Sequence, residues 1–101
     1  MRIYLVATVL DVTEPETLSM KNGNKFQRAT AVVRTKDELD DSYLAIDVCG
    51  EDRIQKLIEA QTSGAPQEMV VTVATRRIEK DNGKVSYLTY FNLKHLFGSM
   101  R

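Results

Sequence analysis

Two short Asn-Gly turns constrain the fold of this chain more than any other feature of its sequence. The first is Lys21-Asn22-Gly23-Asn24 and the second is Asp81-Asn82-Gly83. Asn-Gly fits the two central positions of a type I′ hairpin turn, because both positions need a positive φ that these residues tolerate. The sequence therefore predicts one strand before and one strand after each turn, and with them an antiparallel, β-rich fold.

The strand predicted after the first turn, residues 25–35, has two chemically different faces. One face is small and mostly apolar, which suits a core, and consists of Gln27, Ala29, Ala31, Val33 and Thr35. The other face mixes an aromatic ring with two guanidinium groups, and consists of Phe26, Arg28, Thr30, Val32 and Arg34. An aromatic ring can stack a base and a cation can neutralise a phosphate, so this face can bind nucleic acid. A solvated face with Phe26 folded over one end of a barrel is the alternative.

Hydrophobic periodicity predicts four further strands and one helix. The strands are residues 2–13, 43–49, 68–80 and 84–97. Because both faces of the first strand are apolar, we expect it to pair with two neighbours, as in a small closed barrel. Ile54, Leu57 and Ile58 recur at helical spacing, which predicts a helix from about residue 51 to 60 or 61, ended by Gly64 and Pro66. Residues 16–24 and 36–42 are expected to be polar connections, and residues 98–101 a short frayed tail.

The order of these elements is three strands, one helix and two strands. This is the order of the OB-fold, a five-stranded barrel capped by a helix. An SH3-like barrel would not place such a helix there, and a ferredoxin-like fold would need a helix after its first strand. The sequence therefore predicts an all-β, five-stranded OB-fold barrel (β-β-β-α-β-β) with one short helix between strands 3 and 4. Residues 1–101 are expected to form this single domain.

Charge is segregated along the chain although the formal net charge is zero. Every charged residue from 17 to 36 is basic, whereas residues 37–52 hold seven acids and no base. A second basic cluster flanks the second turn and consists of Arg76, Arg77, Lys80 and Lys84. A zero net charge argues against nucleic-acid binding by bulk charge, so binding would depend on where the cations lie. Neighbours on a strand point to opposite faces, so at most one of Arg76 and Arg77 can join a given groove.

Catalytic and metal chemistry find little support in the sequence. One cysteine and one histidine cannot form a zinc site of the usual thiolate and imidazole kind, and we expect no metal and no cofactor. Cys49 and His95 lack an orienting carboxylate, and a buried or half-buried cysteine at a strand end is the expected role of Cys49. The aromatic residues of the last strand are expected to pack in the core or at an edge; they are Tyr87, Tyr90, Phe91 and Phe97.

Five short motifs stand out along the chain, namely Pro15-Glu16 after the first strand, Lys21-Asn22-Gly23, Phe26 with Ala29-Thr30, the step Cys49-Gly50 into the helix, and Asn82-Gly83. Together they resemble the bacterial single-stranded-DNA-binding proteins and small OB-fold proteins related to them. The resemblance implies that Phe26 and Tyr43 stack bases. It implies that four cations track the backbone, namely Lys21, Lys25, Arg28 and Arg34. That family usually stacks bases on tryptophan, which this chain lacks.

The sequence therefore predicts a non-enzymatic protein that binds single-stranded nucleic acid, DNA in the first place and RNA as a second possibility. The expected binding residues are Lys21, Lys25, Phe26, Arg28, Arg34, Tyr43, Arg76, Lys80 and Lys84. An OB-fold module for protein–protein interaction or oligomerisation is the alternative function. We also expect a homo-oligomer, no membrane and no small-molecule substrate. A single cysteine excludes an internal disulfide framework, which favours a reducing compartment such as the cytoplasm.

Overall fold

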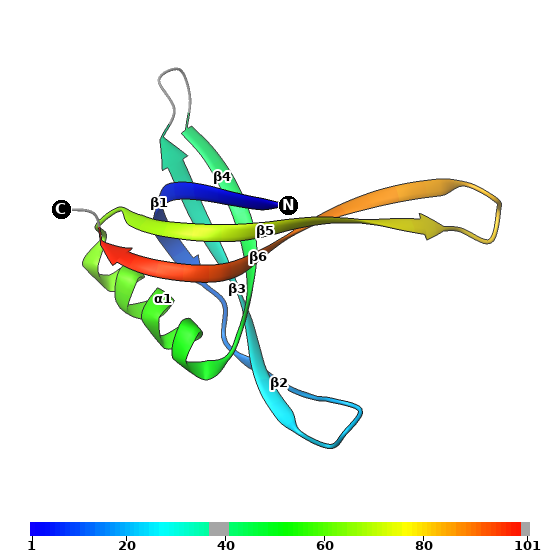
Figure 1. The fold of residues 1–101 in the computed structure, drawn as a ribbon, viewed down its shortest axis with the longest axis horizontal. Helices are drawn as coiled ribbons and strands as arrows, with labels where there is room; N and C mark the ends of the chain where they lie inside the picture. Colours follow the sequence, from blue (N-terminus) through cyan, green and yellow to red (C-terminus); the bar gives the residue numbers. More distant parts are fainter. Residues whose placement is uncertain (37–40, 100–101) are drawn as a thin grey trace.

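A computed structural model of the protein describes residues 1–36 and 41–99 (Figure 1). These residues form six strands and one helix. In chain order the elements are β1 (Arg2–Val12), β2 (Glu16–Ser19), β3 (Lys25–Lys36), β4 (Asp41–Cys49), α1 (Glu51–Ser63), β5 (Gln67–Glu79) and β6 (Val85–Ser99). The predicted β-rich architecture with one helix is therefore confirmed.

The strand pairings close on themselves. The order of the sheet is β1-β5-β6-β4-β3-β2, and β1 also pairs with β3. The first half of β1 pairs with β5 and its second half with β3, with a register shift between Val9 and Asp11. This confirms the prediction that the first strand has two partners. On the opposite side, β4 and β6 pair in parallel through Asp47 and Asn92 alone. The resulting circuit is closed, as a small barrel requires.

The helix position differs from the prediction. It was expected between strands 3 and 4 of five, and it lies between β4 and β5 of six. The difference arises from β2, because residues 16–24 were expected to be a connection. Glu16 to Ser19 instead pair antiparallel with the start of β3. The turn folds this segment back onto β3, so even polar residues find backbone partners there, and exposed hairpin residues need no apolar alternation.

Neither Asn-Gly turn is of type I′. Gly23 and Gly83 have φ of 85° and 81°, and no residue other than glycine has a positive φ in the part of the chain that the structure describes. Asn22 and Asn82 therefore lack the positive φ that a type I′ turn requires. The side-chain oxygen of each Asn accepts a hydrogen bond from the backbone N–H two residues later, at 3.0 and 3.1 Å. This Asx turn holds the asparagine at negative φ.

Both turns are three-residue loops of the same construction. In the second, the Gly83 N–H donates to the Lys80 carbonyl and the Lys80 N–H donates to the Lys84 carbonyl, each at 2.9 Å. The same two bonds join Met20, Gly23 and Asn24 in the first turn, at 3.0 and 2.7 Å. This is a type I turn followed by a left-handed glycine. The predicted hairpins are present, but each loop is one residue longer than expected.

Gly83→Val should lower the free energy of unfolding by about 1 kcal/mol or more, because a β-branched residue is strained at positive φ. A Cβ at Gly83 would meet no heavy atom within 4 Å, so the cost comes from the backbone conformation and not from a clash. Gly83→Asn is the matched control, since Asn tolerates the left-handed region. Urea denaturation should give a lower midpoint for the valine variant. Equal midpoints for the two variants would contradict the observed turn.

Two further predicted boundaries shift. Within the segment 36–42, expected to be a loop, Lys36 ends β3 and pairs with Asp41, and Ser42 pairs with Thr35; residues 37–40 lie outside the described residues. Within the expected tail 98–101, Gly98 and Ser99 pair with β5, and residues 100–101 lie outside the described residues. Both ladders extend past the apolar residues, because backbone pairing at a sheet end does not need a buried side chain.

The core confirms the two faces predicted for residues 25–35. Ala29, Ala31 and Val33 are buried, at 4%, 1% and 0% exposure. The other buried apolar residues are Ala7, Val9, Ile46, Val48, Ile54, Leu57, Ala60, Met69, Val71 and Leu93. Small side chains on β3 leave room for α1, which buries its Ile54, Leu57 and Ala60 side against the strands. No helix in the described residues is long and apolar enough to cross a membrane.

Two hairpins project from the closed part of the sheet in different directions (Figure 1). One is formed by β2 and the start of β3. The other, which we call the β5–β6 arm, consists of residues 75–89. Most of its side chains are exposed, so the arm is held by backbone pairing and not by a core of its own.

Candidate functional site

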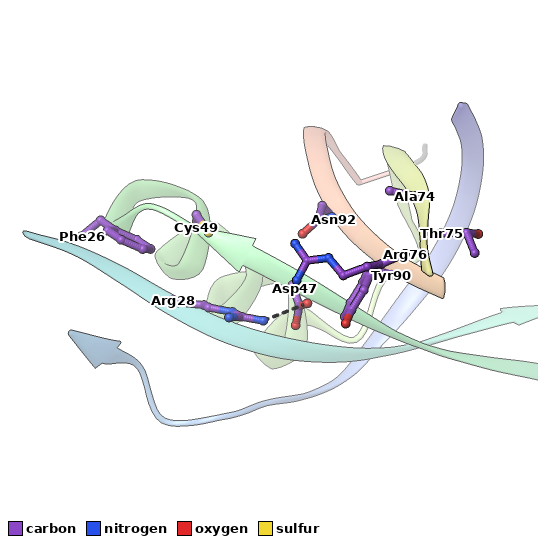
Figure 2. A pocket seen from close by; sticks show the side chains of 9 residues that line it. All are labelled: Phe26, Arg28, Asp47, Cys49, Ala74, Thr75, Arg76, Tyr90 and Asn92. Carbon is purple, nitrogen blue, oxygen red and sulfur yellow. Dashed lines mark hydrogen bonds and ion pairs between the residues drawn. The ribbon is translucent and has the colours of Figure 1, made fainter. Parts of the chain in front are cut away.

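A groove with a volume of about 680 Å³ lies between the two hairpins (Figure 2). Its lining residues are Phe26, Arg28, Asp47, Cys49, Ala74, Thr75, Arg76, Tyr90 and Asn92. They come from β3, β4, β5 and β6, so four strands build one site. Polar, charged and aromatic side chains line it together, which favours a ligand that carries both polar and aromatic groups.

The outward faces of β3 and β4 form one wall of the groove. Side chains alternate along β3, so Phe26 and Arg28 point away from the core while Gln27 and Ala29 point toward it. Arg28 lies opposite Cys49 in the antiparallel register, and Thr30 lies opposite Asp47. The same alternation that buries the alanines therefore aligns the polar residues of both strands on one surface.

Asp47 is hydrogen-bonded on both carboxylate oxygens. Arg28 donates from Nη2 to Oδ2 at 3.1 Å (Figure 2). The Thr30 hydroxyl donates to Oδ1 at 3.2 Å. The Arg28 side chain is 46% exposed and that of Asp47 is 21% exposed. An ion pair this accessible to water contributes little to stability. Arg28 is therefore free to exchange its carboxylate partner for another anion at small cost.

The opposite wall comes from β5 and β6. The Arg76 guanidinium carbon lies 5.9 Å from the centre of the Tyr90 ring, within cation–π range. Figure 2 shows Arg28 and Arg76 entering the groove from opposite walls. Arg77 points to the other face of the arm, where it forms an ion pair with Glu79 at 2.9 Å. The prediction that at most one of Arg76 and Arg77 joins a groove is confirmed.

Three of the predicted binding residues line the groove, namely Phe26, Arg28 and Arg76. Lys21 and Lys25 are exposed at the β2–β3 hairpin, which also carries Phe26. Lys25 and Phe26 also line a smaller hollow of about 380 Å³ near the start of α1. Lys80 and Lys84 flank the turn of the β5–β6 arm. These four lysines thus occupy the two hairpins on either side of the groove and do not line it.

Arg34 and Tyr43 lie apart from the groove. They oppose each other at the far end of the β3–β4 ladder, eight residues along β3 from Phe26. Arg34 lines a separate hollow beside Thr8 and Pro66. The cations expected between residues 21 and 34 therefore do not all meet in one place. In the groove, the second cation comes from β5 instead.

Tyr90 and Asn92 are groove residues that the sequence interpretation missed. Tyr90 was expected to be a packing residue, and it is half-buried in the groove wall. The reason is the turn. The observed three-residue loop pairs Ala74 with Tyr90 and places Tyr90 on the face of Arg76. A two-residue loop would shift every pair by one residue and turn Tyr90 away from Arg76.

The other aromatic residues that were expected to pack differ in their exposure. Phe91 packs against the core, as predicted. Tyr87 and Phe97 are 66% and 62% exposed, which is a correction. Tyr87 lies on the arm, beyond the reach of the core. Phe97 lies near the end of β6 and contacts His95, with ring centroids 6.0 Å apart.

Cys49 is exposed at the end of β4, not buried or half-buried as expected. It shares the outward parity of Asp47, and that parity decides its environment. His95 does not line the groove with it, so the two do not form a nucleophile and base there. Across residues 1–36 and 41–99, no group of three or more His, Cys, Asp or Glu side chains could hold a metal ion.

The comparisons with known proteins concern the fold. No protein-family model and no curated protein sequence matches this chain. Two crystal structures of Rim1, a mitochondrial single-stranded DNA binding protein from S. cerevisiae, are similar to it along nearly the whole chain. The alignments cover 99% of this chain and 97% of Rim1, with TM-scores of 0.60 and 0.56 and sequence identities of 17% and 16%. The chain therefore has the fold of a single-stranded DNA binding protein, which confirms at the level of the fold the resemblance seen in the sequence.

Proposed function

We propose that this protein is a non-enzymatic binder of single-stranded nucleic acid, and of single-stranded DNA in particular. The observation that carries the proposal is the groove, in which Phe26, Tyr90 and two guanidinium groups share one surface. Aromatic faces that stack bases beside cations that meet phosphates are the two components of single-strand binding. The fold shared with Rim1 supports the same conclusion.

The lysines outside the groove fit a path for the backbone. Lys21 and Lys25 lie on one hairpin, and Lys80 and Lys84 lie on the other. A nucleic-acid strand that crosses the groove would pass near both pairs of lysines. Its phosphates would then follow the edges of the groove while its bases face into it. Arg34 and Tyr43 would be reached by a longer strand that continues along the outward face of β3 and β4.

Fluorescence anisotropy of a labelled oligonucleotide tests the proposal directly. A mixed-sequence single strand should bind at micromolar protein in low salt, and a duplex of the same sequence much less well, because its bases are not available for stacking. Preference for the duplex, or no binding of the single strand, would refute this function.

Arg76→Gln should flatten the dependence of log affinity on log salt by roughly 0.7, the value expected for one phosphate contact on a single strand. Arg77→Gln is the matched control. It removes the same charge from the neighbouring residue, which points to the other face and pairs with Glu79. Titrations at four salt concentrations give both slopes. A change of slope that is as large for Arg77 as for Arg76 would contradict the proposed path of the backbone.

The alternative function, an interaction or oligomerisation module, is favoured by one feature of β1. Residues 2–7 pair with β5 on one side, and β3 joins β1 only from Thr8 onward. On their other side these residues have no partner strand among the described residues. An unpaired strand edge is a template for another chain. Exposed side chains accompany it, including Met1 and Tyr4 at 86% and 58% exposure.

We expect the protein to form a dimer or tetramer through this edge. Light scattering at high protein concentration should give a multiple of the monomer mass. Ile3→Lys should lower that mass, since a charge on an edge strand opposes pairing with a second copy. A monomer mass for the unmodified protein would remove the expectation.

Residence in the cytoplasm and the choice between DNA and RNA stay predictions.

A further inference from the structure

The groove carries a carboxylate at its centre. Asp47 is the only acidic residue among the nine that line the groove. Its side chain lies between those of Arg28 and Arg76 (Figure 2). A carboxylate repels phosphate, so a surface made only to hold the backbone gains nothing from an aspartate at this place. The position suits a base better than a phosphate.

Asp47 can accept more hydrogen bonds than it does. Its two oxygens accept one bond each, from Arg28 and Thr30. A carboxylate offers about four acceptor positions, and the side chain remains 21% exposed. The Thr30 hydroxyl holds the carboxylate at the groove even when Arg28 exchanges Asp47 for another anion. A ligand that donates hydrogen bonds would find this acceptor in place.

Asn92 lies beside Asp47. The two residues form the parallel pair that joins β4 to β6. The Asn92 backbone carbonyl accepts a bond from Thr72 at 3.4 Å, and its side-chain amide has no hydrogen-bond partner within residues 1–36 and 41–99. An amide has two donor hydrogens and one acceptor oxygen. Where the two walls meet, the groove thus combines an acceptor-only group with a neighbouring group that can donate.

We propose that Asp47 and Asn92 read the Watson–Crick edge of one base and favour cytosine over thymine and uracil. The proposal rests on the proposed function and adds base selectivity to it. The exocyclic amino group of cytosine donates to Asp47, as in other carboxylate–cytosine contacts, while N3 and O2 of the ring accept from Asn92. Uracil and thymine place a carbonyl oxygen where cytosine has its amino group. That oxygen meets the carboxylate as acceptor against acceptor, so the contact is repulsive and the hydrogen bond made by cytosine is lost.

Oligodeoxycytidine and oligodeoxyuridine of equal length are the probes, because they lack the 5-methyl group that thymine would add. The protein should bind oligodeoxycytidine about tenfold more tightly, within the range of one base-specific contact. Asp47→Asn and Asn92→Leu should bring this ratio close to one. Glu79→Gln should leave it unchanged. This control removes the same charge from another Arg–carboxylate pair, the one that Glu79 forms with Arg77 outside the groove. Thermal unfolding confirms first that each variant is folded.

The outcomes are distinguishable. If the protein binds both oligonucleotides equally well, the selectivity is refuted and the proposed function stands. If it binds neither, the proposed function is refuted and the selectivity with it. If Asp47→Asn raises the affinity for both probes and leaves their ratio unchanged, Asp47 acts only as a counter-charge to Arg28, and the proposal is overturned. The unmodified protein alone gives the first two outcomes, so the test does not depend on any variant.

Discussion

Tyr90→Ala should weaken the binding of a single-stranded oligonucleotide by about 1 to 3 kcal/mol, the usual cost of removing one stacking platform. Tyr90 is half-buried in the groove wall and lies under the Arg76 guanidinium, so its ring is already ordered before a base arrives. Stacking involves no net charge, and the loss should therefore be the same at low and high salt. Anisotropy titrations at two salt concentrations measure it.

Tyr87→Ala is the matched control for this prediction. Tyr87 is on β6 like Tyr90 and is 66% exposed, but it pairs with Arg77, and neither Tyr87 nor Arg77 lines the groove. Its removal should change the affinity little. Phe26→Ala should behave like Tyr90→Ala, since Phe26 lines the same groove. Equal losses of affinity for the Tyr87 and Tyr90 variants would mean that the oligonucleotide does not run through the groove.

Leu57→Ala should lower the free energy of unfolding by about 2 to 5 kcal/mol, the range for deleting a buried leucine side chain. Leu57 is 1% exposed and lies on the side of α1 that packs against the strands. The contact matters more than in a barrel with long ladders throughout, because β4 and β6 are joined by one residue pair only. The helix and the core hold this part of the circuit together.

Urea denaturation followed by circular dichroism measures the effect. Lys56→Ala, on the exposed side of the same helix turn, is the control and should change the midpoint little. A loss below about 1 kcal/mol for Leu57→Ala would mean that the helix can move to fill the cavity.

The local patterns of the sequence predicted the fold well. The alternation in residues 25–35 identified the buried alanines of β3, because a strand with one small apolar face has only one way to meet a core. Gly64 marked the end of α1, where it adopts a φ of 69°. Such signals act between neighbours in the chain, so they can be interpreted without knowledge of the tertiary structure.

The groove could be predicted only in part, because strands far apart in the sequence assemble it. Phe26 and Arg28 were found from one strand. Tyr90 depended on the register of the second hairpin, and that register depends on whether Asn82 adopts a positive φ. Asp47 and Asn92 meet through a parallel pair between strands separated by α1 and β5, and no local pattern predicts that contact. Short polar β2 was missed because its pairing comes from the turn and not from its side chains.

Cys49 provides a unique site for chemical labelling within the groove. It is the only cysteine of the chain, and its exposed thiol opens into the space between the two hairpins. A maleimide dye would therefore attach at a single position without any engineered residue. Its emission would follow the filling of the groove by unlabelled oligonucleotides in real time, and a photoreactive group on the same sulfur would record which nucleotide lies there.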